Sequence, residues 1–187
     1  MYTVFIDRDG TINKNLAFPN VNTSGKLQLL PRAAKGIKLL NDIGCMTIVL
    51  TNQAGINNYE NSLNWKKFEK ITIVLNQMIE KECSAKLDDT FCCPHTVFEK
   101  CACRKPQSGL LKKAMERYPD ISIDRSFIIG DRSADIGLGN KSGIISILVL
   151  TGHGMGEKAI LKKNGMTPDY IEVDLLAAAQ RIKKLIK

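Results

Sequence analysis

The chain lacks any apolar run that approaches the ~20 residues needed to cross a bilayer. Its first apolar stretch breaks at Asp7 and follows no basic leader, so we expect neither a signal peptide nor a membrane anchor. A cytoplasmic location then follows by default. Aromatic residues make up only 6% of the chain, and they are not interleaved with the basic residues as a base-stacking surface would require. The net charge of +8 therefore favours a small anionic ligand, and a nucleic-acid partner is not expected.

Internal repeats, low-complexity segments and linkers are also missing. With 187 residues the chain can bury one good core, so we expect a single domain over residues 1–187 and a monomer. Six cysteines are present, and in a reducing compartment clustered cysteines indicate metal ligands more often than disulfides.

Apolar stretches alternate with amphipathic segments along the chain. Strands are predicted at residues 3–6, 45–50, 90–93, 126–129 and 144–150. Helices are predicted at residues 34–44, 65–78, 110–118, 158–164 and 175–186, with a short helical stretch after residue 133. Residues 13–30 are polar and irregular and predict a loop or flap, and the glycine-containing segments 137–142 and 152–156 also predict loops. This alternation indicates an α/β fold, a Rossmann-like doubly wound parallel sheet.

Polar motifs follow the strands at their carboxyl ends, and in a parallel sheet those ends share one edge. The first strand runs into Asp7-Arg8-Asp9-Gly10-Thr11, and the second ends in Thr51-Asn52-Gln53. The fourth ends in Gly130-Asp131-Arg132, with Asp135 four residues after Asp131. Each motif alone is most often an ordinary turn. Their convergence on one edge predicts one site, in which neighbouring carboxylates beside a phosphate would need a hard divalent cation.

A cluster of potential metal ligands follows the third strand. Cys93 and His95 are separated by one residue, as are Cys101 and Cys103. Three thiolates and one imidazole satisfy a closed four-coordinate zinc site, so we expect a zinc-binding loop at residues 93–103. A disulfide or a coincidence of composition is the alternative. Cys92 should point to the opposite face of its strand, away from this cluster.

Together these motifs resemble the haloacid dehalogenase superfamily of phosphatases. Asp7-Arg8-Asp9-Gly10-Thr11 is similar to the nucleophile motif of that superfamily. Cys101-Ala102-Cys103-Arg104-Lys105-Pro106 narrows the resemblance to the heptose 1,7-bisphosphate phosphatases and their histidinol-phosphate phosphatase relatives. The resemblance implies a strand order of 3-2-1-4-5. With no room for a large cap domain, the flap and the zinc loop would shape the substrate pocket.

The resemblance also implies roles for individual residues. Asp7 would be the nucleophile of an aspartyl-phosphate mechanism, Asp9 its general acid and base, and Lys105 the cation that neutralises the phosphoryl oxygens. Mg²⁺ would be bound by Asp7, Asp131 and the backbone carbonyl of Asp9. The residues expected to contact substrate are Thr51, Asn52, Gln53, Arg104 and Arg132. Asp135 would be either a further ligand of the cation or an acid that orients the ligands, and the role of His153 stays open.

Two departures from the family pattern concern the substrate. Arg132 stands where the heptose enzymes usually have Lys, and residues 55–59 lack an Arg that they usually carry after Thr51-Asn52-Gln53. The expected activity is Mg²⁺-dependent hydrolysis of a small sugar phosphate, with heptose 1,7-bisphosphate as the first choice of substrate. The alternatives are histidinol phosphate, a nucleic-acid 3′-phosphate, and a non-enzymatic zinc module.

Overall fold

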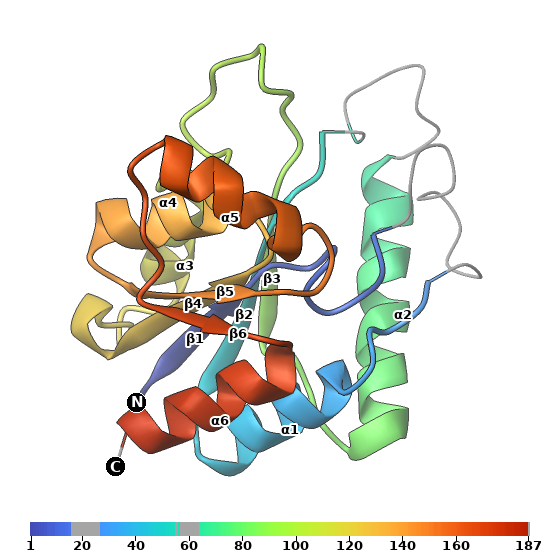
Figure 1. Cartoon of the computed structure of the whole chain (residues 1–187). Helices are drawn as coiled ribbons and strands as arrows, with labels where there is room; N and C mark the ends of the chain where they lie inside the picture. The colour runs from blue at the N-terminus through green and yellow to red at the C-terminus, as the bar shows by residue number, and fades with distance from the viewer. Residues whose placement is uncertain (16–26, 55, 57–63, 187) are drawn as a thin grey trace.

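The central feature is a six-stranded parallel sheet in the order β3-β2-β1-β4-β5-β6 (Figure 1). The computed structural model describes residues 1–15, 27–54, 56 and 64–186. The strands are β1 Thr3–Ile6, β2 Met46–Asn52, β3 Asp89–Cys93, β4 Ser126–Gly130, β5 Ile145–Val149 and β6 Tyr170–Glu172. The predicted doubly wound fold and the predicted order of the first five strands are confirmed.

β1 lies in the middle of the sheet because its residues are apolar on both faces. Thr3 pairs with Met46 of β2 on one side and with Ser126 of β4 on the other. Val4 packs in the core on one face of the sheet, whereas Phe5 packs in the core on the opposite face. A strand that is buried on both faces must leave the core before it can carry charged groups. The two acids of the first motif accordingly follow the last residue of β1.

Helices cover both faces of the sheet (Figure 1). Those in the described residues are α1 Ala33–Asp42, α2 Trp65–Cys83, α3 Gly109–Arg117, α4 Ser133–Ser142, α5 Gly154–Lys163 and α6 Leu175–Leu185. Buried residues of α1, α2 and α6 join the larger apolar core, and those of α3, with Leu138 of α4, join the core on the other face. Ile136 of α4 packs in a smaller cluster with Leu148 and Leu161. No helix in the described part of the chain is long and apolar enough to cross a bilayer.

The structure corrects three predictions of secondary structure. Residues 137–142 belong to helix α4 and not to a loop. A Cβ at Gly139 would lie 2.7 Å from Ser146 Cβ, so glycine at this position allows the helix to pack closely against β5. Helix α5 begins at Gly154, four residues before the predicted start, so it includes most of the predicted 152–156 loop. The three-residue strand β6 was not predicted, because so short a segment shows no clear alternation. Of the predicted flap, residues 16–26 lie outside the described residues.

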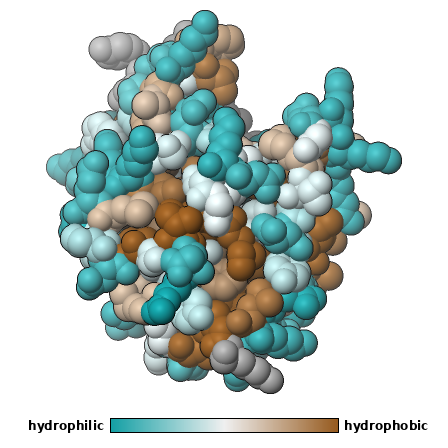
Figure 2. Space-filling view, turned by 90° about the vertical axis from the view of Figure 1, so that its left-hand side faces the viewer, coloured by the Kyte–Doolittle hydropathy of each residue, from teal (hydrophilic) through white to brown (hydrophobic). Residues whose placement is uncertain are grey.

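Basic side chains occupy the outer faces of the surface helices, as the helical spacing predicts. Lys112 and Lys113 on α3 and Lys162 and Lys163 on α5 are exposed. Figure 2 shows hydrophilic side chains around an apolar area on the face that lies to the left in Figure 1.

Candidate active site

The carboxyl ends of the strands surround a pocket of about 300 Å³. It brings together most of the residues that the sequence nominates for catalysis or binding. Its lining consists of Asp7, Asp9, Asn15, Thr51, Asn52, Arg104, Lys105, Arg132, Ser133, Ala134, Asp135 and Glu157. Loops from distant parts of the chain thus form one site because all the strands are parallel.

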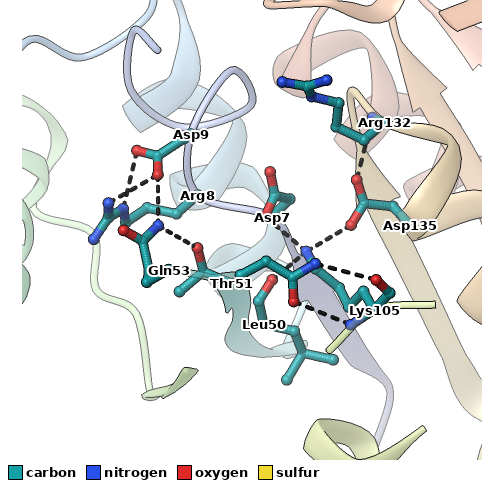
Figure 3. Close-up of polar contacts among 10 residues, drawn as sticks. Asp7, Arg8, Asp9, Leu50, Thr51, Gln53, Lys105, Arg132 and Asp135 are labelled. Atoms are coloured by element: carbon teal, nitrogen blue, oxygen red, sulfur yellow. Dashed lines mark hydrogen bonds and ion pairs between the residues drawn. The ribbon is translucent and has the colours of Figure 1, made fainter. Parts of the chain in front are cut away.

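The Lys105 ammonium lies at the base of this pocket. Its Nζ is 2.7 Å from Asp7 Oδ1 and 2.6 Å from Asp135 Oδ1, and it also donates to the carbonyl of Leu50 (Figure 3). Burial alone would lower the pKa of this ammonium, but the Asp135 and Asp7 carboxylates outweigh that effect and raise it. Lys105 is therefore a fixed positive charge between two acids.

A third carboxylate, Asp131, lies beside the other two. Carboxylate oxygens of Asp7, Asp131 and Asp135 lie within 4.8 Å of one another. Asp131 is fully buried. Its Oδ2 accepts from the His153 backbone N–H at 2.8 Å, and its Oδ1 has no hydrogen-bond partner among the described residues. Burial, together with the nearby charge of Asp7, raises the pKa of Asp131 to about 7. Burial also raises the pKa of Asp135 to about 6, although Lys105 opposes the shift.

This cluster fits a divalent cation. Three buried carboxylates face one ammonium, so negative charge is in excess, and an unpartnered buried oxygen is available as a ligand. Asp135 joins the cluster, whereas sequence reasoning left its role open. The Asp9 side chain is not among the clustered carboxylates.

Asp9 is bound by a separate set of donors. Arg8 donates to both of its oxygens, through Nε at 3.1 Å and Nη2 at 2.8 Å. Asn13 donates to Oδ1 at 2.8 Å, and Gln53 donates to Oδ2 at 2.6 Å. Burial by itself would raise the pKa of Asp9, but the Arg8 guanidinium and these hydrogen bonds lower it. Figure 3 shows the Asp9 carboxylate directed toward Arg8 and Gln53, away from Lys105.

The Thr51-Asn52-Gln53 motif forms hydrogen bonds that hold Lys105 and Asp9 in place. Asn52 is hydrogen-bonded to both backbone groups of Lys105, accepting from its N–H at 3.0 Å and donating to its carbonyl at 3.2 Å. Gln53 is buried and donates to Thr51 as well as to Asp9. Thr51 and Asn52 reach the pocket, whereas Gln53, expected to contact substrate, is not part of its lining.

The four residues of the predicted zinc site come together after β3. The Sγ and Nδ1 atoms of Cys93, His95, Cys101 and Cys103 all lie within 4.8 Å of one another, and all six cysteines of the chain are free. Sγ–Sγ distances of 3.1 to 3.6 Å are close to the ~3.8 Å edge of a tetrahedron with ~2.3 Å metal–sulfur bonds. The cluster can therefore hold a metal ion.

Hydrogen bonds favour the thiolate form at Cys101. Burial opposes it, but backbone N–H groups of Arg104 and Cys103 outweigh the burial and lower the pKa of Cys101 to about 7. Cys92 packs against the core on the other face of the sheet from Cys93, as the alternation along the strand predicts.

The cluster also connects to the pocket. Arg104 donates its backbone N–H to Cys101 Sγ at 3.3 Å, and its guanidinium donates to the His95 carbonyl at 2.9 Å. Arg104 therefore lines the pocket in an orientation that the Cys/His loop fixes, and Lys105 follows it directly.

Two residues at the site gave no clear signal in the sequence. Arg8 is only 2% exposed and lies over the Phe68 ring, 5.6 Å from its centre. Glu157 is buried on α5 and accepts from the Ser133 backbone N–H at 2.8 Å and from Arg132 Nη1 at 3.4 Å. Burial would raise the pKa of Glu157, but Ser133 and Arg132 lower it, so this carboxylate is ionised. Only the tertiary structure reveals these pairings.

Gly152 is the third residue that the structure adds. Its φ is +55°, and a Cβ there would lie 2.2 Å from Asp131 Oδ2 and 2.6 Å from Gly10 Cα. We predict that Gly152→Ala displaces Asp131, abolishes activity and lowers the free energy of unfolding by ~3 kcal/mol, through left-handed strain and overpacking.

Gly165→Ala is the matched control. Gly165 has a similar φ of +63°, but no atom of the described part of the chain lies within 4 Å of an added Cβ. It should lose only ~1 kcal/mol and keep its activity. Equal losses for the two variants in urea titrations would show that crowding at Asp131 is unimportant.

Known proteins resemble this chain in sequence and in structure. A family model described as HAD-hydrolase-like matches residues 102–179. The D-glycero-alpha-D-manno-heptose-1,7-bisphosphate 7-phosphatase of Photorhabdus laumondii is 33% identical over 174 residues, which cover 87% of this chain and 92% of the relative. The corresponding beta-heptose enzyme of Helicobacter pylori strain J99 is 34% identical over 152 residues, covering 79% of this chain and 82% of the relative.

A solved structure extends the similarity to the whole fold. The crystal structure of D,D-heptose 1,7-bisphosphate phosphatase from B. bronchiseptica, complexed with magnesium and phosphate, superposes with a TM-score of 0.86. It is 25% identical and the match covers 99% of both chains. The resemblance inferred from the motifs is thereby confirmed. The chain belongs to the haloacid dehalogenase-like hydrolases, in the family of the heptose bisphosphate phosphatases, and is a phosphatase.

Proposed function

We propose that this phosphatase removes the 7-phosphate of D-glycero-D-manno-heptose 1,7-bisphosphate. The observation that carries the proposal is the Lys105 ammonium held between Asp7 and Asp135 at the base of a pocket that Arg104 and Arg132 also line. The names of the relatives support the same substrate, although they differ in the anomer that they specify.

Asp7 is the proposed nucleophile. The Lys105 ammonium, 2.7 Å from Asp7 Oδ1, orients this carboxylate and can neutralise charge on the transferring phosphoryl group. Attack by an Asp7 oxygen on phosphorus breaks the bond to the sugar oxygen and leaves an aspartyl phosphate. Water then attacks phosphorus and breaks its bond to the Asp7 oxygen, which releases inorganic phosphate and regenerates the carboxylate.

Mg²⁺ is the proposed cation of the carboxylate cluster. Asp7 and Asp131, with Asp135 beside them, would hold it, and when bound it supplies positive charge to the phosphoryl oxygens. The Asp9 carbonyl stays a predicted ligand.

Asp9 is the proposed general acid for the leaving sugar oxygen and the general base for the attacking water. In the structure four side-chain hydrogen bonds hold it as a carboxylate. To donate a proton, its side chain must leave Arg8 and turn toward Asp7. Arg8, Asn13 and Gln53 therefore define a resting position for the acid.

The substrate contacts are proposed to come from three residues of the lining. Thr51, Arg104 and Arg132 face the pocket, and the two guanidinium groups suit bidentate binding of phosphate oxygens. Asn52 and Gln53 are better explained as supports of Lys105 and Asp9. Lys105 faces the transferring phosphoryl group, so among the described lining residues Arg104 and Arg132 are the cations available to the second phosphate. A bisphosphate uses them better than histidinol phosphate, which carries an amine.

The test of this proposal is kcat/KM measured side by side with Mg²⁺ on four substrates. These are the two anomers of heptose 1,7-bisphosphate, histidinol phosphate and a 3′-phosphorylated oligonucleotide. We expect one of the two anomers to be the best substrate. A preference of ~100-fold, or ~2.7 kcal/mol of transition-state binding, for either of the other two would overturn the assignment.

We propose zinc as the ion of the Cys93, His95, Cys101 and Cys103 cluster. Three sulfurs and one imidazole nitrogen form a closed tetrahedral donor set, which is typical of structural zinc. Thiolate ligands of this kind suit a reducing compartment, in line with the cytoplasmic location proposed from the sequence. The role of the ion would be to hold the loop that positions Arg104 and Lys105.

Cys101→Ser should lose this zinc and lower kcat/KM by roughly 10- to 100-fold, because Arg104 and Lys105 lose their support. Metal analysis of the purified protein should find one zinc per wild-type chain and none in the variant. Cys83→Ser, which changes a free cysteine outside the cluster, is the matched control and should keep the ion. A wild-type protein without zinc, or a Cys101–Cys103 disulfide, would contradict this part of the proposal.

A further inference from the structure

Glu157 is a buried acid on the wall of the pocket, and it has no role in the reaction as proposed. It lies on α5 and is 5% exposed, while its neighbours Gly156 and Lys158 are exposed. A buried carboxylate is costly unless it is paired. Its partners are the Ser133 backbone N–H and the Arg132 guanidinium, both at the start of α4.

Helix α5 holds this region at two points one helical turn apart. The His153 backbone N–H donates to Asp131, and Glu157, four residues later, accepts from Ser133. Residues four apart lie on the same face of a helix. The first turn of α5 therefore holds the segment from Asp131 to Ser133 from both ends.

Carboxylates of the protein already occupy the N-terminus of α4. Asp135 accepts from the Arg132 backbone N–H at 3.2 Å, and Glu157 accepts from that of Ser133 at 2.8 Å. Free N–H groups at a helix N-terminus commonly bind anions. With these two N–H groups taken, the Arg132 guanidinium is the charged group of this wall, as described, that can meet an anionic substrate.

We infer that Glu157 is a positioning residue that holds the Arg132 guanidinium over the pocket, where it meets the part of the substrate that is not transferred. This inference rests on the proposed function, because it requires a substrate with a second anionic group. The Arg132 side chain is 45% exposed, and Figure 3 shows it extending away from Asp135. A long side chain in that setting loses rotamer freedom when it binds a ligand, and a fixed partner reduces that loss.

The experiment compares Glu157→Gln with the wild-type enzyme. Glutamine can still accept from the Ser133 N–H, but it removes the charge that holds Arg132. For heptose 1,7-bisphosphate we expect KM to rise roughly three- to tenfold, with a smaller change in kcat. This range corresponds to the entropy lost when one long side chain is ordered on binding. For p-nitrophenyl phosphate, which has no second anionic group, the rise in KM should be clearly smaller.

Glu172→Gln is the matched control. Glu172 accepts from Arg181 Nε at 2.8 Å, in an Arg–Glu pair of similar exposure that joins β6 to α6 away from the pocket. This variant should leave kinetics on both substrates unchanged. A second variant, Glu157→Gln combined with Arg132→Met, should be no worse on the bisphosphate than Arg132→Met alone.

Three results would overturn the inference. They are an unchanged KM for the bisphosphate, equal losses on both substrates, and additive losses in the double variant. If the wild-type enzyme does not cleave heptose bisphosphate, the proposed function fails. The Glu157 comparison is then made between p-nitrophenyl phosphate and a substrate that the enzyme does cleave and that carries a second anionic group, such as another sugar bisphosphate or the 3′-phosphorylated oligonucleotide, so the two failures are read separately.

Discussion

The site depends on the balance of charge among carboxylates gathered at one edge of the sheet. Asp7, Asp131 and Asp135 lie within 4.8 Å of one another, and burial raises the pKa of Asp131 to about 7. Lys105 offsets part of the negative charge through its contacts with Asp7 and Asp135. The negative charge that remains explains why a divalent cation fits there. A bound phosphate ester would add further negative charge to the site.

The position of Lys105 in turn depends on two separate supports. Asn52, at the end of β2, binds both backbone groups of Lys105, and the Leu50 carbonyl accepts from its ammonium. The Cys/His loop holds the preceding residue, Arg104, through Cys101 and His95. The proposed zinc would then have a structural role beside the active site, because the loop that it would hold delivers Arg104 and Lys105 to the pocket.

The sequence predicts the sheet and its acidic edge well, for a physical reason. Acids directly after a strand buried on both faces are unfavourable unless they have a task, so Asp7 and Asp131 stand out. The Cys/His cluster is recognised by donor type and spacing alone. Contacts between distant segments could not be predicted in the same way. Glu157 is one acid among the lysines of α5, and Gly152 matters only because the Asp131 carboxylate lies against it.

The hydrogen-bond partners of the polar residues near these acids could not be predicted from the sequence either. In the sequence, Arg8 is one polar residue of a turn, yet in the structure it is buried over Phe68 and binds both oxygens of Asp9. Gln53 was expected to contact substrate, and its amide is instead hydrogen-bonded to Asp9 and Thr51. Residue type and strand position indicate that a group belongs to the site, while its partner is decided by packing.

The central claim, that Asp7 carries the phosphoryl group, is tested most directly by trapping the intermediate. Asp9→Asn enzyme would be mixed with Mg²⁺ and p-nitrophenyl phosphate, whose good leaving group needs no acid, then quenched in acid and reduced with borohydride. Reduction converts an aspartyl phosphate to homoserine, which peptide mass spectrometry locates. Homoserine at position 7, and none in an Asp7→Asn control, is the expected result. Release of nitrophenol with unmodified Asp7, or modification of another residue, would contradict the mechanism.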